Sequence, residues 1–316
     1  MTSTDWLDIV DFHTHLWPAH WAAADGSGHQ PGFGFSDDIR RRITSPSALI
    51  DEALAGGVSL SVISATIESR FGTEAPVDAA EVSRTNDYLA GLVQAHPDHL
   101  AALAVVDVFS GEAGAREAER AVGELGLSGI VIDSSRHGVF PGDASARPTL
   151  EVAARLKVPV FVHPNNTPGR ESLIAGAGAL GNSLGRGLMN GVAFLSLLQS
   201  GLLDELPDLH LVFATLGLGA IVQASRGGKY GREARAAGLR PNIYFDTMGH
   251  DPAIIRTLTG FFGAERVLAG TDWPILPALS RPTLTASLTE ASLDAEAQAL
   301  IAGANARRLL ALRTPG

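Results

Sequence analysis

Two histidines, His13 and His15, follow the apolar segment 7–12 near the start of the sequence. In a β-strand, residues two apart point to the same face, so the two imidazoles would project together. Imidazoles that converge on one point suit Zn²⁺ or a similar divalent ion. On its own a His-x-His pair is weak evidence, because two histidines on a strand face often belong to a polar surface.

Two further residues of the metal-ligand type end apolar runs later in the chain. His163 follows the run 158–162, and Asp272 follows the run 267–269. A lone histidine in such a place is more often a packed residue, and an aspartate is more often a helix cap or turn residue. Taken with the first pair, they predict a mononuclear site for Zn²⁺, with Mn²⁺ as the other candidate and room for a water or substrate oxygen.

The rest of the chain alternates short apolar runs with longer stretches of helical spacing. The eight apolar runs are Leu7–Phe12, Val58–Ile63, Leu100–Val106, Gly129–Ile132, Val158–Val162, Leu209–Ala214, Ile243–Phe245 and Val267–Ala269. The helical stretches include Pro46–Ala55, Ala79–Ala95, Glu112–Glu124, Thr149–Leu156, Leu188–Leu203 and Pro252–Phe262. Alternating strands and helices imply parallel βαβ units. An open doubly wound sheet is the alternative to a barrel.

We predict that residues 1–316 form one α/β domain, a (β/α)8 TIM barrel. Eight units fit a chain of 316 residues, and no linker divides it. In a closed barrel the eighth strand lies beside the first, so ligands at the ends of strands one, five and eight converge. An open sheet would bring these distant residues together less easily.

Two connections are longer than usual and would form long βα1 and βα5 loops at the catalytic face of the barrel. They are Leu16–Ser45, which is rich in aromatic residues and glycine, and Pro164–Gly187. The first is interpreted as a wall of the active site, with a self-packed surface loop as the alternative. The glycine-rich part, Gly176–Gly187, lacks a phosphate-binding motif and is interpreted as a flexible loop.

The charge and cysteine content of the chain exclude some classes of function. Lys and Arg total 24 against 34 Asp and Glu, and this net charge of −10 argues against general affinity for nucleic acid or an anionic membrane. It leaves room for an anionic small-molecule substrate in a locally basic cleft. The chain has no cysteine, so any metal must be held by histidines and carboxylates. The first residues lack the pattern of a signal peptide, and no apolar stretch reaches about 20 residues, so we expect a cytoplasmic protein.

Several segments resemble the amidohydrolase superfamily, in the branch that contains α-amino-β-carboxymuconate-ε-semialdehyde decarboxylase and γ-resorcylate-type decarboxylases. The matching segments are 11–15, 160–164, 201–209, 244–247, 263–274 and 303–310, in the order of the family. The resemblance implies a distorted TIM barrel, one divalent metal, usually zinc, and frequent homodimers. It also implies that His13, His15, His163 and Asp272 are the metal ligands.

One position departs from the family. There, the strand after the Leu-Pro-Asp-Leu segment ends in a histidine that polarises the metal-bound water or moves the proton, whereas this chain has Thr215. A threonine hydroxyl stays protonated near neutral pH, so it can form hydrogen bonds but cannot act as a general base. His210 stands near the start of the same strand and would lie at the opposite end of the barrel. The proton-transfer role is therefore lost or moved.

Three loop histidines, His250, His137 and His20, are candidates for the moved role, with His250 the best placed after strand seven. For each, an ordinary loop histidine is the more frequent outcome, and Asp251 beside His250 could simply cap the next helix. Two roles are open to Asp272, which could ligate the metal and also accept the proton of an attacking water.

Four residues are candidates for binding the substrate. Arg41, within the run 40–42, and Arg136, beside His137, could bind a substrate carboxylate, although a charge run is more often a solvated surface. Trp17 and Trp273 each follow a presumed ligand and could form a flat wall for an aromatic or unsaturated ring. Plain packing at the barrel rim is an equal alternative for both tryptophans.

Three hypotheses for function follow. The first is a metal-dependent lyase that decarboxylates an aromatic or unsaturated carboxylic acid, with the metal stabilising charge as the C–C bond breaks. The second is a metal-dependent hydrolase of a lactone, amide or ester. The third is a diverged barrel that keeps the metal but has altered or lost the reaction, because Thr215 replaces the family histidine.

Overall fold

The computed structural model describes residues 7–22, 35–214, 217 and 228–312. Eight parallel strands follow one another in the order of the chain, each paired with the next. They are β1 (Val10–His15), β2 (Leu60–Ser64), β3 (Leu100–Val105), β4 (Gly129–Asp133), β5 (Pro159–His163), β6 (His210–Phe213), β7 (Ile243–Asp246) and β8 (Val267–Leu268). Apart from the partly buried His210, every strand residue is buried. Strands covered on both faces read as continuous apolar runs, which is why the sequence marks them clearly.

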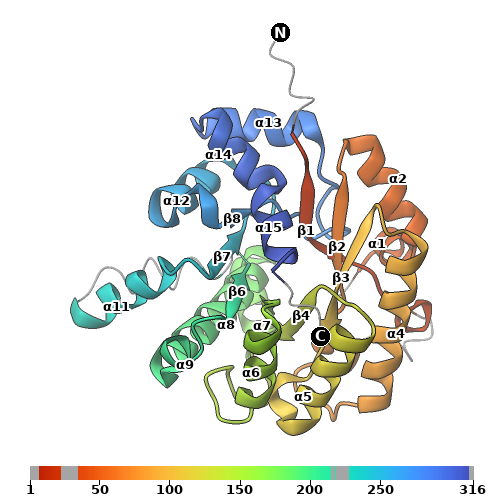
Figure 1. Ribbon diagram of the computed structural model, residues 1–316, viewed down its shortest axis with the longest axis vertical. Coiled ribbons are helices and arrows are strands. Elements are labelled where there is room, and N and C mark those ends of the chain that lie inside the picture. The colour runs from red at the N-terminus through yellow and green to blue at the C-terminus, as the bar shows by residue number, and fades with distance from the viewer. Residues whose placement is uncertain (1–6, 23–34, 215–216, 218–227, 313–316) are drawn as a thin grey trace.

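Backbone hydrogen bonds between the first strand and the segment after β8 close the ring. The amide of Phe12 donates to the carbonyl of Ala269, and the amide of Asp272 donates to the carbonyl of His13, at 2.9 and 2.8 Å. The amide of His15 donates to the carbonyl of Trp273 at 2.9 Å. The predicted TIM barrel is therefore confirmed, and the helices surround the strands (Figure 1).

Helices of very different length connect the strands or follow the last of them. They are η1 (Ala19–Ala22), α1 (Asp37–Ile43), α2 (Pro46–Gly56), α3 (Ile67–Phe71), α4 (Ala79–Ala95), η2 (Val108–Ser110), α5 (Glu112–Glu119), η3 (Arg120–Glu124), α6 (Arg147–Leu156), α7 (Arg170–Ala177), α8 (Ala179–Ser200), α9 (Leu202–Glu205), α11 (Gly228–Gly238), α12 (Pro252–Phe262), η5 (Ala264–Arg266), α13 (Arg281–Glu290), α14 (Ala295–Ala299), η6 (Leu300–Ala304) and α15 (Asn305–Leu310). None of these described helices combines the length and apolarity needed to cross a membrane.

The connection after β5 corrects one prediction. We expected a flexible loop over Gly176–Gly187, but the segment ends α7 and forms the first turns of α8. A Cβ at Gly181 would lie 2.1 Å from the carbonyl oxygen of Leu173, and one at Gly185 would lie 2.5 Å from Cγ2 of Thr167. The glycines therefore allow α8 to pack closely against α7, and close packing outweighs the low helix propensity of glycine. The long βα5 connection is mostly helical.

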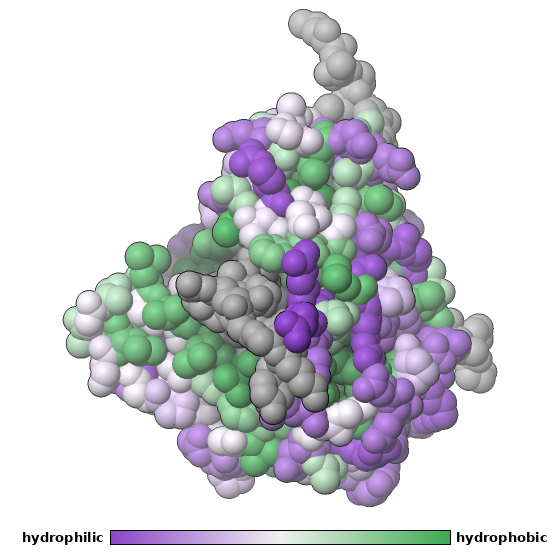
Figure 2. All heavy atoms as spheres, turned by 90° about the vertical axis from the view of Figure 1, so that its left-hand side faces the viewer, coloured by the Kyte–Doolittle hydropathy of each residue, from purple (hydrophilic) through white to green (hydrophobic). Residues whose placement is uncertain are grey.

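A row of leucines covers the outer face of α8. Leu180, Leu184 and Leu188 are 76%, 68% and 55% exposed, and residues four apart lie on one helix face. Leu239 after α11 and Ile254 on α12 are also large exposed apolar residues. Figure 2 faces the side of the molecule that bears α11 in Figure 1, and it shows hydrophobic side chains over much of the described surface there. Exposed apolar rows of this kind can mark interaction sites in soluble proteins.

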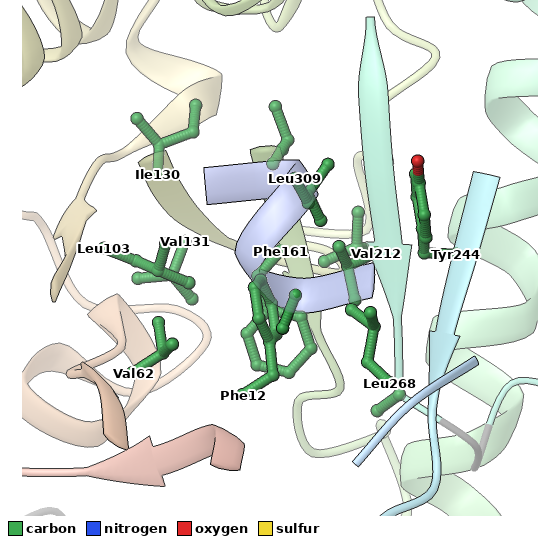
Figure 3. Packing of buried hydrophobic residues seen from close by; sticks show 14 of the residues in the cluster. Phe12, Val62, Leu103, Ile130, Val131, Phe161, Val212, Tyr244, Leu268 and Leu309 are labelled. Atoms are coloured by element: carbon green, nitrogen blue, oxygen red, sulfur yellow. The ribbon is translucent and has the colours of Figure 1, made fainter. Parts of the chain in front are cut away.

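Side chains fill the centre of the barrel. Phe12 and Phe161 meet edge to face, with ring centroids 6.0 Å apart, and apolar residues of the other strands surround them (Figure 3). Leu309 of α15 packs near the same core, and Arg307 of that helix pairs with Asp8, just before β1, at 2.8 Å. Because the interior is packed, side chains that bind a ligand have room mainly at the carboxyl ends of the strands.

Candidate metal centre

The four predicted ligands meet at the carboxyl ends of the strands. His13, His15, His163 and Asp272 each offer one ligand atom, and these atoms all lie within 4.8 Å of one another. Nε2 of His15 lies 3.1 Å from Oδ1 of Asp272, and Nε2 of His13 lies 3.6 Å from the same oxygen. In the part of the chain that the structure describes, no other group of three or more histidine, aspartate or glutamate side chains has this geometry.

The three imidazoles stand nearly perpendicular to one another. Their ring centroids are 5.0 to 5.4 Å apart, with interplanar angles of 83 to 86°. The pairing of β1 with β2 changes register between Asp11 and Thr14, so β1 is irregular where it carries His13. Such irregularities re-aim side chains near active sites. The strand pattern predicted that His13 and His15 share one face of β1. The irregularity in β1 changes the direction of the His13 side chain on that face.

Asp246, at the end of β7, positions His13. Its Oδ2 accepts a hydrogen bond from Nδ1 of His13 at 2.6 Å, and both side chains are fully buried. Because Nδ1 carries the proton, Nε2 of His13 carries a free lone pair. This buried atom has no hydrogen-bond partner among the described residues. Burial lowers the pKa of His13, but the charge of Asp246, the hydrogen bond to it and the nearby carboxylates of Asp272 and Asp11 together raise that pKa. A carboxylate behind a histidine is the usual support of a metal ligand.

The other ligands are electrostatically poised to bind a cation. Burial lowers the pKa of His15, and burial next to His15 and Arg186 lowers the pKa of His163 well below its usual value. Burial opposes ionisation of Asp272, but the hydrogen bond with His15 lowers its pKa. Neutral imidazoles beside an ionised carboxylate are the protonation states that a divalent ion requires.

The backbone at Asp272 is held in an uncommon conformation. Its φ is +68°, a left-handed value that non-glycine residues rarely adopt. The preceding Thr271 holds the turn in place, because its hydroxyl and its amide both donate to the carboxylate of Asp11, at 2.6 and 3.0 Å. Strain of this kind persists where surrounding contacts over-determine the backbone, and it clusters at functional sites.

A pocket opens directly above these ligands. Its volume is about 330 Å³, which is the size of a small-molecule site. His15, His163 and Asp272 form part of its wall. The other lining residues are Trp17, Phe35, Ile43, Ser69, Asn166, Arg170, Asn182, Ser183, Arg186, Met248, Ile275 and Leu276. A wall that combines apolar side chains with several polar and charged groups suits a ring or an unsaturated chain that carries polar substituents.

The sequence profile of the amidohydrolase family matches residues 10–312. This chain belongs to the amidohydrolase family. The predicted resemblance is thereby confirmed.

Decarboxylases are among the relatives of this amidohydrolase. A 2-amino-3-carboxymuconate-6-semialdehyde decarboxylase of Dictyostelium discoideum is 27% identical over 337 aligned positions, which cover 96% of this chain and 91% of the relative. A gamma-resorcylate decarboxylase of Rhodococcus jostii is 27% identical over 281 positions, covering 79% and 83%. The fold resembles the crystal structure of a dihydroxybenzoic acid decarboxylase from a Polaromonas species with bound manganese and 2-nitroresorcinol. That comparison has a TM-score of 0.79 and 22% identity, and it covers 97% of each chain.

Only one of the four predicted substrate-binding residues lines the pocket of this amidohydrolase, and it is Trp17. Trp273 is fully buried, its indole N–H donates to Glu52 at 3.0 Å, and it packs at the rim. Arg41 is exposed and pairs with Asp38 at 2.5 Å. Arg136 is buried away from the pocket, where its guanidinium donates to the carbonyl oxygens of Gly72 and Ala75.

The candidate proton-transfer histidines also lie outside the pocket lining. His137 is exposed and pairs with Glu74 at 3.0 Å, and His20 bonds to Glu81 at 2.5 Å. His250 is half-buried, and the carboxylate of the following Asp251 caps α12. Thr215 lies outside the described residues. Asp272 is the only carboxylate in the described lining of the pocket.

Three functional candidates were missed by sequence reasoning, namely Asp246, Arg170 and Arg186. Asp246 ends β7 just as the ligands end their strands, so its position alone was a usable signal. Arg170 and Arg186 are the only cationic residues in the long connection 164–187, which the sequence placed at the catalytic face of the barrel. Both line the pocket through α7 and α8 rather than through a loop.

Proposed function

We propose that this amidohydrolase is a metal-dependent decarboxylase of an aromatic or unsaturated carboxylic acid. The observation that carries the proposal is the convergence of His13, His15, His163 and Asp272 beside a pocket of about 330 Å³ that is lined by both apolar and polar side chains. The decarboxylase relatives, which match most of the chain, support the reaction type.

The four residues fit a single divalent cation, and we propose that they are its ligands. The unpartnered, buried Nε2 of His13 is the decisive atom, because a buried nitrogen without a partner is costly unless something binds its lone pair. Three imidazoles and one carboxylate favour Zn²⁺. Mn²⁺ is the alternative, supported by the manganese bound in the structurally similar dihydroxybenzoic acid decarboxylase.

The reaction replaces the C–COO⁻ bond of the substrate by C–H and releases CO₂, so one proton must reach the carbon. The bound cation would attract electron density from substrate oxygens and stabilise the charge that develops as the bond breaks. Asp272 is the only carboxylate in the described lining of the pocket, so we propose that it accepts a proton from water and delivers it to the carbon. Trp17 and its apolar neighbours hold the ring or chain and exclude water.

Release of CO₂ tests the reaction. The metal-loaded protein is incubated with a panel of hydroxybenzoates and unsaturated carboxylic acids, and also with lactones and esters. We expect CO₂ from at least one acid, loss of that activity in Asp272→Ala, and no change in Asp208→Asn, an exposed surface control. Hydrolysis without CO₂ release would favour the hydrolase hypothesis. A metal-loaded protein inactive on every compound would favour a diverged barrel.

We further propose a homodimer that covers the leucine row of α8. The row, Leu180, Leu184 and Leu188, is the most exposed group of large apolar side chains in the described structure. Light scattering coupled to size-exclusion chromatography should show a mass near 66 kDa, about twice the chain mass of 32.9 kDa. Leu184→Glu should shift the protein toward the monomer. A monomeric wild-type protein at micromolar concentration would contradict the proposal.

A further inference from the structure

The two arginines of the pocket have different electrostatic partners. Arg186 of α8 is already neutralised, because its Nη1 lies 3.1 Å from a carboxylate oxygen of Glu68, a residue that is only 1% exposed. The same guanidinium also donates to the side chain of Asn166 and to the carbonyl of Pro164. Arg186 therefore contributes mainly to the architecture of the pocket wall.

Arg170, at the start of α7, has no such neutralising partner. Its Nε donates to Oδ1 of Asn182 at 2.7 Å, and within the described structure its guanidinium forms no ion pair with a carboxylate. It is partly buried and lines the pocket together with Asn182. A guanidinium has five N–H donors, so the two terminal nitrogens keep their donors available. A positive charge with free donors in a pocket wall is suited to bind an anionic group of a ligand.

Packing holds this guanidinium in a defined place. Asn182 orients its Nε, and the close contact of α7 with α8 at Gly181 and Gly185 fixes the two helices relative to each other. The metal ligands come from strand ends, whereas Arg170 comes from a helix beyond β5. The pocket therefore combines a candidate cation site and a separate, preorganised guanidinium. Preorganisation lowers the entropic cost of binding.

We propose that Arg170 binds a second carboxylate of the substrate, and that the substrate of this enzyme is a dicarboxylic acid. This inference rests on the proposed function: one carboxylate occupies the metal centre and is lost as CO₂, and the other stays on the guanidinium of Arg170. A planar guanidinium matches a carboxylate through two parallel hydrogen bonds, a geometry that a lysine cannot reproduce. Apolar side chains, among them Trp17, Ile275 and Leu276, complete the wall for the ring or chain that carries both groups.

Matched ligand pairs test the second carboxylate directly. Dissociation constants are measured by calorimetry on the metal-loaded protein for benzoate against the three benzenedicarboxylates, and for hexa-2,4-dienoate against hexa-2,4-dienedioate. We expect at least one dicarboxylate to bind roughly 10- to 100-fold more tightly than its monocarboxylate partner, the range typical of one charged hydrogen-bonded pair. In Arg170→Leu the ratio of the two dissociation constants should fall to within about twofold. Arg170→Lys should restore only part of the preference.

The control variant is Arg155→Leu, which removes an exposed arginine of α6 that pairs with Glu119. It should leave every dissociation constant unchanged. Absence of a dicarboxylate preference in the wild-type protein, or a preference that survives in Arg170→Leu, would overturn the inference.

The carbon dioxide assay separates this inference from the proposed function. If the preference exists and depends on Arg170 but no compound releases CO₂, the anion subsite stands and the decarboxylase proposal fails. If CO₂ is released but only monocarboxylates bind well, the decarboxylase proposal stands and the subsite is wrong.

Discussion

Replacing Asp246 by asparagine tests how the metal centre is built. The carboxylate of Asp246 and the imidazole of His13 form a fully buried pair, with Oδ2 2.6 Å from Nδ1. Asparagine keeps the shape of the side chain, and its amide oxygen can still accept the bond from Nδ1. The negative charge is lost, so the substitution isolates the electrostatic support that the carboxylate provides to the ligating nitrogen of His13.

The size of the effect follows from this geometry. A hydrogen bond to an ionised acceptor is roughly twice as strong as one to a neutral acceptor, and the pair has no solvent to compensate for the lost charge. Loss of such a supporting carboxylate typically costs 10- to 100-fold in metal affinity. This corresponds to about 1.4–2.7 kcal/mol of binding free energy. The fold should survive, because the volume of the side chain is conserved and its hydrogen bond to His13 can still form.

The measurement is the dissociation constant for Zn²⁺ and for Mn²⁺, determined by competition with a chelator of known affinity. Asp208→Asn is the control, since Asp208 is exposed and lies 3.4 Å from Lys157 on the surface. Circular dichroism checks that both variants remain folded. If the metal affinity of Asp246→Asn lies within twofold of the wild-type value, the carboxylate does not strengthen Nε2 of His13 as a ligand. That result would refute the proposed role of Asp246.

Three further predictions test the structure around the site, with Gly176→Ala as a control for the first. Gly181→Ala should lower the free energy of unfolding by about 1–3 kcal/mol in thermal or chemical denaturation, because its Cβ would overlap the backbone of α7, whereas Gly176→Ala, with nothing within 4 Å, should be neutral or stabilising. Gly270→Ala would place a Cβ 2.9 Å from that of His13, so metal titration should show weaker binding. Burial opposes ionisation of Glu81, but hydrogen bonds outweigh it and lower its pKa to about 2. The ionised form therefore stabilises the fold above its unfolded pKa of about 4.3 and ceases to do so as the pH falls toward about 2, so urea titrations of Glu81→Gln should lose less stability than the wild type over that range.

The sequence indicated the barrel because its signal is local. Strands buried on both faces are continuous apolar runs, and each run can be recognised without knowing its neighbours. Strand boundaries were less well predicted: β1 extends to His15, beyond the predicted end at Phe12. The prediction of a flexible loop at the glycine-rich start of α8 was wrong. Helix propensity is a local property, whereas the close approach of Leu173 to Gly181 is a tertiary contact that the sequence does not reveal.

Sequence alone also determined which ligands could meet. Parallel strands all end at one rim, so residues that end strands converge whatever the loops do, and His163 and Asp272 could be placed beside His13 from topology. The tertiary structure decided which other side chains line the pocket beside these ligands. Arg170 and Arg136 both follow strand ends, but Arg170 lines the pocket whereas Arg136 donates to a backbone carbonyl. Contacts between segments that are remote in the sequence decide which of these an arginine does. Side-chain partners are set by packing, and packing exists only once the chain has folded.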